Sequence, residues 1–193
     1  ITIISKPPSE KIVNETVELL SQIEKPSVMN FIGYKGKDIS SSLKFADTLE
    51  DAARISYSFT NKGQFKLPEW TSESEVKETK DKLTNDQVYV RGLFSGGTIC
   101  YETQYIMSKA GIKAYSNAPL DKNYEIGGFD ASKKDTVLDM GAEEFVRGVP
   151  HPMINFRFRN ERLLKEVEDK NVAVILFDLV LGYGANMNPA KEI

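Results

Sequence analysis

Residues 88–111, VYVRGLFSGGTICYETQYIMSKAG, run from an apolar segment into an amphipathic one through the turn Ser95-Gly96-Gly97-Thr98. The apolar part is typical of a buried β-strand, and the amphipathic part is typical of a helix that begins at Gly97 or Thr98. A strand that passes through a glycine turn directly into a helix is typical of parallel sheets, whose faces are covered by helices. This stretch therefore predicts an α/β fold.

Segments with these patterns recur along the chain in strand–helix–strand order. They predict strands at residues 1–4, 27–33, 88–94, 136–140 and 172–182, and helices that begin at or after Ser9, Thr48 and Asn160. Strands separated by helices pair in parallel, so we expect parallel sheets with helices covering them.

The chain divides by composition into three parts. Residues 57–87 are polar, charged and poor in aliphatic side chains, which predicts a linker with a solvated helix inside it. Residues 1–56 and 88–193 then form separate α/β units. Because the chain begins on an apolar strand without an initiator methionine, we expect it to be a piece of a longer protein.

The bulk composition excludes several classes of protein. A net charge of -3 argues against non-specific binding of nucleic acid, and no apolar run approaches the ~20 residues that a membrane span requires. The single cysteine favours a reducing, cytoplasmic location. The single histidine, His151, rules out a metal site with several histidines within this chain, and we predict no metal site.

The turn at residues 95–98 is the most specific candidate site. The first amides of a helix have no partner within the helix, and together with the helix dipole they favour an anion. Glycine lets a phosphate approach the backbone at Gly96 and Gly97, while Ser95 and Thr98 offer hydroxyl groups. The alternative is that a hydroxyl caps the helix and the glycines only form a tight turn.

Three other positions carry weaker signals, each with a structural alternative. Gly182 and Gly184 follow a strand, where glycine permits close approach to a ligand or a plain turn. His151 could act as an acid, a base or a transient phosphate carrier, or could only hydrogen-bond its own loop. Asp139 begins an acidic group that could bind Mg²⁺ or merely cap a helix, and Cys100 is expected to be inert.

Several motifs resemble those of the FdrA family, relatives of the succinyl-CoA synthetases. The resemblance in the second unit is carried by VRGLFSGGTICYE, VLDMGAEEFVRGVPHPMI and VILFDLVLGYGA, and in the first unit by IISKPPSE and KPSVMNFIGYKG. It implies flavodoxin-like ligase-CoA domains in three layers, α/β/α. Residues 1–56 would be the C-terminal part of one such domain, and residues 88–193 would be a second one.

The resemblance also assigns roles to residues. Ser95, Gly96, Gly97 and Thr98 would hold a phosphoryl group, with Ser95 where the relative has a substrate-facing asparagine. The loop Gly182-Tyr183-Gly184 would contact the carboxylate of the substrate, and Asp139, in a motif similar to the relative's strand and glycine loop, would be a further substrate-binding residue. The family's phosphorylated histidine has no counterpart in YKGKDISSS, residues 34–42, so a relay through that position is excluded.

Three functions remain open at this point. The first is an acyl-CoA synthetase-like activity on an acyl phosphate, which would use CoA and a nucleoside triphosphate with Mg²⁺ in the full-length protein. The second is a component of an oxamate carbamoyltransferase that uses carbamoyl phosphate. The third is a non-catalytic subunit. In each case we expect a small-molecule acid or carbamoyl phosphate as ligand, and other subunits or a homo-oligomer, but no nucleic acid and no membrane.

Overall fold

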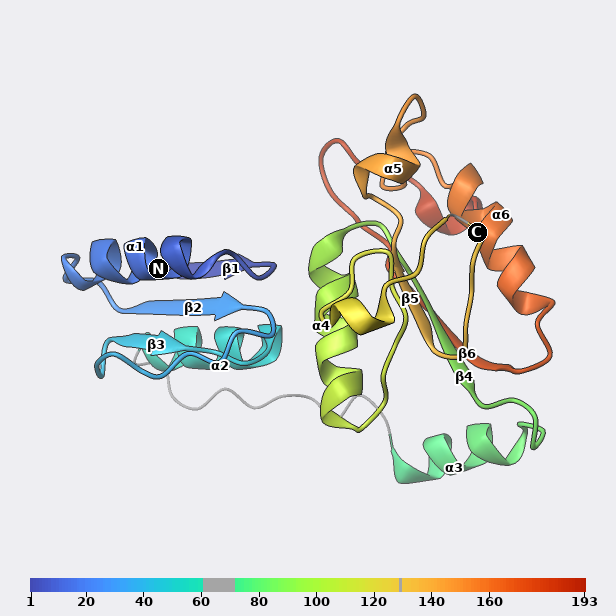
Figure 1. Cartoon of the computed structure of the whole chain (residues 1–193), viewed down its shortest axis with the longest axis horizontal. Coiled ribbons are helices and arrows are strands. Elements are labelled where there is room, and N and C mark those ends of the chain that lie inside the picture. The colour runs from blue at the N-terminus through green and yellow to red at the C-terminus, as the bar shows by residue number, and fades with distance from the viewer. Residues whose placement is uncertain (61–71, 129) are drawn as a thin grey trace. The chain divides into compact units, whose positions relative to one another are not determined.

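A computed structural model of the chain describes residues 1–60, 72–128 and 130–193. The chain forms two compact units, Ile1–Trp70 and Thr71–Ile193 (Figure 1). Most of the predicted linker at residues 57–87 lies either outside the described residues or in α3 (Glu73–Asp81), none of whose residues is buried. The assignment of the two units to two ligase-CoA-type domains stays a prediction.

The first unit is a parallel sheet between two helices. Its strands pair in the order β1-β2-β3. The elements are β1 (Thr2–Ser5), α1 (Glu10–Ser21), β2 (Ser27–Phe31), β3 (Leu43–Phe45) and α2 (Leu49–Ser58). Ser9 caps α1 and Thr48 caps α2, each accepting a hydrogen bond from the amide three residues on.

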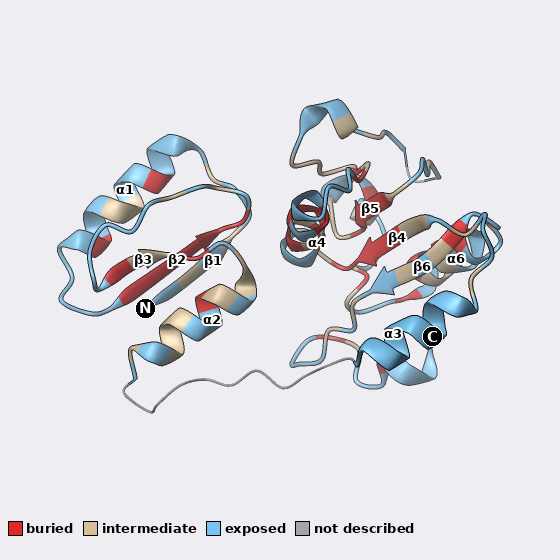
Figure 2. Ribbon diagram, turned by 90° about the horizontal axis from the view of Figure 1, so that it is seen from below, coloured by how far each residue is buried: buried red, intermediate tan, exposed pale blue. Residues whose placement is uncertain are grey.

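The central strand β2 is buried on both faces, as Figure 2 shows. Met29 and Phe31 pack in the same cluster as Val13 of α1, whereas Val28 packs with Ala52 of α2. Successive side chains of a strand point to opposite faces, so this alternation places one helix on each face. The unit therefore has the three layers α/β/α that were predicted.

The second unit repeats this plan. Its parallel sheet has the order β5-β4-β6. The elements that build it are β4 (Tyr89–Phe94), α4 (Gly97–Lys109), η1 (Lys122–Tyr124), β5 (Thr136–Asp139), α5 (Glu143–Val146), α6 (Arg157–Val167), β6 (Val172–Phe177) and η2 (Pro189–Lys191).

The helices α4 and α6 cover opposite faces of this sheet. Phe94 and Val137 pack with Cys100 of α4, whereas Leu93 and Leu138 pack in a cluster that Leu163 of α6 contacts. The predicted parallel three-layer fold is therefore confirmed. Among the described helices, none combines the length and apolar character that crossing a membrane requires.

Two predicted boundaries are wrong. The sequence predicts a helix that begins at or after Asn160, but α6 begins at Arg157. The sequence predicts a strand over residues 172–182, but β6 ends at Phe177. The apolar run continues, yet the next residue, Asp178, accepts hydrogen bonds from the Ser95 amide and hydroxyl at 2.8 and 2.9 Å. This contact turns the chain toward the end of β4, and the ladder stops.

A buried charge network joins β4 to α6. Glu166 accepts from Arg91 Nε at 2.7 Å and from Arg162 Nε at 2.7 Å, and it also accepts from the Ser132 hydroxyl. Burial alone would raise the pKa of Glu166, but the hydrogen bonds from Ser132, Arg162 and Arg91 outweigh burial and hold that pKa below its ordinary value. Removing one partner of such a network leaves buried charge without compensation.

We predict that Glu166→Gln lowers the free energy of unfolding by about 3 kcal/mol at pH 7. Because the pKa of Glu166 is depressed in the folded state, its contribution is complete above the unfolded value of 4.5 and is lost as the pH falls through the folded pKa. Urea unfolding of wild type and variant should therefore give a difference that shrinks as the pH is lowered below 4.5.

A matched control is Glu78→Gln in α3. Glu78 pairs with Lys82 at 2.8 Å, but both side chains are exposed, so the change should be below about 0.5 kcal/mol. Equal effects of the two substitutions would show that the buried network contributes nothing specific.

Candidate functional site

The carboxyl ends of the three strands meet at one edge of the second unit's sheet. Phe94 pairs with Asp139, and Leu93 pairs with Phe177, so the residues that follow each strand lie side by side. Ligands of open parallel sheets gather at this edge. The edge is therefore the candidate functional site.

The helix α4 begins at this edge without a side-chain cap. Its N-cap is Gly96, in an extended conformation with φ -169°, so the first amides of the helix donate no hydrogen bond to an N-cap side chain. Gly96 and Gly97 are half-buried and Thr98 is exposed, which leaves one side of the turn open to solvent. A helix start without a side-chain cap is a common place for an anion to bind, and the predicted binding of an anion at these amides stays a prediction.

A carboxylate lies beside the same amides. A Cβ atom added to Gly97 would lie 3.0 Å from Asp139 Oδ2 and 3.6 Å from the Tyr101 ring. Glycine at position 97 therefore lets the Asp139 carboxylate come close to the start of α4, where a negative charge is stabilised by the helix dipole. An anion bound to these amides would share this end of the helix with Asp139.

Ser95 has different partners from those expected. It is almost fully buried, and its hydroxyl donates to Asp178 Oδ1 at 2.9 Å and accepts from Arg159 Nη1 at 2.7 Å. Its amide also donates to Asp178 Oδ1, at 2.8 Å. The hydroxyl thus fixes the turn in this conformation, and its predicted contact with a phosphate stays a prediction.

Arg159 is the residue of this site that the sequence interpretation missed. Its Nη1 atom donates to the Asp178 carbonyl at 2.6 Å and to Asp178 Oδ1 at 2.9 Å. The guanidinium lies over the rings of Phe156 and Phe177, 4.7 and 5.9 Å from their centroids. Burial lowers the pKa of Arg159, and the Asp178 carboxylate opposes that effect. The aspartate within an apolar strand segment was the signal in the sequence that a buried cation would be near.

His151 also reaches the edge of the sheet. A Cβ atom added to Gly141 would lie 2.6 Å from His151 Nε2 and 2.2 Å from the Ser95 carbonyl oxygen, so these segments meet because residue 141 is glycine. His151 Nδ1 accepts from the Met153 amide at 3.2 Å, which places the proton of the neutral imidazole on Nε2. The histidine is thus held by its own loop, and a catalytic role stays a prediction.

The loop Gly182-Tyr183-Gly184 is tied to the loop that carries His151. Gly182 and Gly184 have φ values of 156° and 86°, which favour glycine. The amide of Asn186 donates to the Met153 carbonyl at 2.9 Å. Tyr183 is fully exposed, so the loop presents an aromatic ring to solvent next to the histidine loop. Its predicted contact with a substrate carboxylate is not tested by this geometry.

The acidic side chains near β5 are engaged in structural contacts. Asp139 Oδ1 accepts from the Gly141 amide at 3.0 Å, and Glu144 accepts from Asn117 at 3.0 Å. Within residues 1–60, 72–128 and 130–193, no three acidic, histidine or cysteine side chains gather closely enough to hold a metal ion. Cys100 is buried, and burial raises the pKa of its thiol to about 12, so it is a poor nucleophile.

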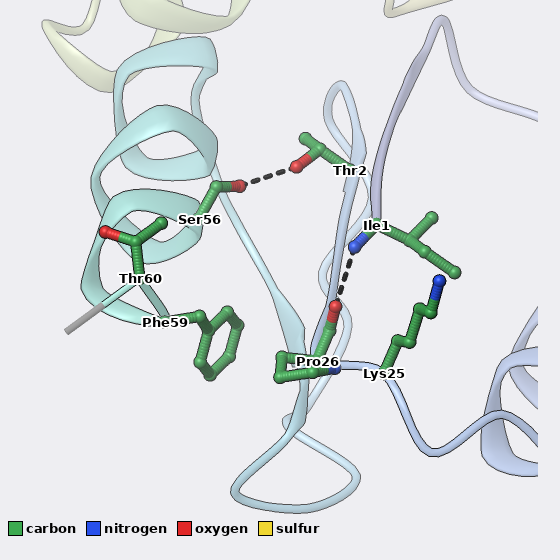
Figure 3. A pocket seen from close by; sticks show the side chains of 7 residues that line it. All are labelled: Ile1, Thr2, Lys25, Pro26, Ser56, Phe59 and Thr60. Carbon is green, nitrogen blue, oxygen red and sulfur yellow. Dashed lines mark hydrogen bonds between the residues drawn. The ribbon is translucent and has the colours of Figure 1, made fainter.

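A pocket in the first unit lies at the amino edge of its sheet. Figure 3 shows its lining, in which the amino group of Ile1 donates to the Pro26 carbonyl at 2.7 Å and the Thr2 and Ser56 hydroxyls are 2.7 Å apart. These residues stand where β1 and β2 begin. Because ligands gather at carboxyl ends, we do not assign this pocket a function.

Comparison with known proteins places the site in a family. A model of the CoA-ligase family, described as CoA-ligase, matches residues 93–193. The chain is also similar to the "Uncharacterized protein YahF" of Escherichia coli (strain K12), with 35% identity over 192 residues. That alignment covers 98% of this chain and 37% of the relative, so the chain spans little more than a third of the relative's length. The matched residues include the turn at 95–98, Asp139, His151 and the loop at 182–184. Because the match covers more than half of the chain, the chain belongs to the CoA-ligase family.

Proposed function

We propose that this chain is part of an acyl-CoA synthetase-like protein of the FdrA type, and that its second unit binds the phosphoryl group of an acyl phosphate. The observation that carries the proposal is the start of α4, with its amides at Gly97 and Thr98, at the carboxyl edge of a CoA-ligase domain. The phosphoryl group would accept hydrogen bonds from these amides, and the Thr98 hydroxyl would add a further donor.

The chemistry suits such a site. An acyl phosphate is a mixed anhydride in which a charged phosphate is bonded to a carbonyl carbon. When the acyl group is transferred, negative charge develops on the bridging oxygen, and fixed amide donors stabilise that charge without reorganising. The amides of α4 would act in this way. Asp139, beside the same amides, would weaken the binding of free phosphate and so favour its release.

The other parts of the edge would bind the acyl portion. The loop Gly182-Tyr183-Gly184 would contact the substrate carboxylate with its backbone amides, and Asp139 would contact the substrate between this loop and the turn. His151 is the one histidine available to carry a proton or a phosphate. What supports these roles is that all three segments follow or flank strands that end at one edge.

CoA and a nucleoside triphosphate with Mg²⁺ would be the cofactors of the full-length protein, as they are in general for this family. The start of α4 would bind one phosphoryl group, and we assign no step in this chain to bound CoA or nucleotide. Residues 34–42, after β2, contain no histidine, so a phosphohistidine there is excluded. Further subunits, or a second copy, would complete the active site.

We predict that inorganic phosphate shifts the ¹⁵N–¹H signals of Gly97 and Thr98 in the 193-residue chain, with weak affinity because of Asp139. Gly97→Val should weaken this binding at least about tenfold, because the valine side chain would stand in tight contact with Asp139 Oδ2 and crowd the amides. Titration followed by NMR measures both effects.

The control is Gly127→Val, a glycine outside the site whose φ is not positive. It should leave the phosphate shifts of Gly97 and Thr98 unchanged. Equal phosphate affinity in the wild type and in Gly97→Val would show that the anion is not bound at the start of α4.

The activity itself is tested on the full-length protein. With nucleoside triphosphate and candidate acids, and with CoA left out so that no thioester forms, hydroxylamine should trap an acyl phosphate as a hydroxamate, and the product should depend on the acid. The comparisons give no support to carbamoyl transfer, and a parallel reaction with carbamoyl phosphate and oxamate should release no phosphate above background. Phosphate release in that reaction, without hydroxamate in the first, would contradict the synthetase-like function.

A further inference from the structure

The geometry points to Arg159 and Asp178 as positioning residues that hold the Ser95-Gly96-Gly97 turn in the shape that binds a phosphoryl group. Neither residue touches the bound group in this proposal, and both act through Ser95. The inference rests on the function proposed above, since it explains how the amides of that site are kept in place.

The contacts join three elements at one point. Asp178 Oδ1, just after β6, accepts from the Ser95 amide at 2.8 Å and from the Ser95 hydroxyl at 2.9 Å. Arg159, in the first turns of α6, donates from one nitrogen to Ser95 Oγ at 2.7 Å and to Asp178 Oδ1 at 2.9 Å. Ser95 is thus held from two sides, immediately before the two glycines.

The turn needs such support because its own residues supply little. Glycine restricts the backbone least of all residues, and Gly96 stands between β4 and α4 while Gly97 is the first residue of α4. Gly96 offers no side chain to cap the helix. The direction in which the amides of Gly97 and Thr98 point therefore depends on how Ser95 is fixed.

The ion pair is costly to bury, which argues for a role other than stability. Arg159 is 1% exposed, and among the residues that the structure describes none accepts a hydrogen bond from its Nη2 atom. A buried pair of this kind often contributes no more stability than apolar side chains of similar volume. The rings of Phe156 and Phe177 could pack against an apolar residue equally well.

The same helix provides a matched comparison. Arg162 lies one turn further along α6, is equally buried, and pairs with Glu166 rather than with the edge that holds the turn. Arg159 and Arg162 therefore lie on the same helix with the same charge and the same degree of burial, but their partners lie at opposite ends of the sheet. Substituting each by methionine separates support of the turn from general stability.

The experiment titrates the 193-residue chain with inorganic phosphate and follows the amide signals of Gly97 and Thr98. Arg159→Met should weaken phosphate binding about tenfold and shift these two signals even without phosphate, since the turn is no longer fixed. Arg162→Met should lower the midpoint of urea unfolding by at least as much as Arg159→Met does. It should nevertheless leave phosphate affinity within about twofold of wild type. Arg159→Lys, which keeps a donor for Ser95 and Asp178, should restore part of the affinity.

The outcomes separate the two proposals. If wild type binds phosphate at these amides and Arg159→Met binds equally well, the positioning role is wrong and the phosphoryl site stands. The role is also wrong if Arg162→Met weakens binding as much as Arg159→Met does. If the wild type shows no phosphate shift at Gly97 and Thr98, the phosphoryl site itself fails. Should Arg159→Met not fold, Arg159→Lys and Asp178→Asn decide the question by the same measurement, and unchanged affinity in both would overturn the positioning role.

Discussion

The second unit depends on Asp178, which lies just after the end of β6 and anchors Ser95 just after the end of the neighbouring strand β4. Parallel pairing of β4 with β6 brings Phe177 beside Leu93, so the residues after both strands come within hydrogen-bond distance. The Asp178 carboxylate then binds the Ser95 amide and hydroxyl. A strand end, a glycine turn and a helix start are thereby fixed by one carboxylate, whose charge is balanced by Arg159.

The helix α6 carries buried charge to both ends of the sheet. Near its start Arg159 donates to Asp178 and Ser95. Further along, Glu166 accepts from Arg162 and from Arg91 of β4. A helix that returns antiparallel to the strands must begin at their carboxyl edge and end at their amino edge. One network therefore joins elements where no ligand is expected, while the other lies beneath the turn where a ligand is expected.

The fold was largely predictable because it follows from local patterns. Apolar runs predicted the strands, and the glycine turn predicted a helix that begins at Gly97 or Thr98, where α4 does begin. The end of β6 and the partners of Ser95 could not be predicted, because both depend on Asp178, which is 83 residues away from Ser95 in sequence. Likewise, nothing in residues 157–167 shows that Arg159 is buried, since an arginine in a charged helix normally faces solvent.

The charges around the turn favour a site that would select a phosphoryl group by the direction of its amide N–H bonds rather than by a net positive charge. Asp178 balances Arg159, and Asp139 adds a negative charge beside the amides of α4. A site that attracted phosphate by net charge would bind every anion, and it would hold the released phosphate as firmly as the reacting group. Backbone amides form strong hydrogen bonds only with an oxygen that lies along their N–H bonds. For that reason the rigidity of the two-glycine turn, and hence the side chains that anchor Ser95, would matter more here than an additional cation.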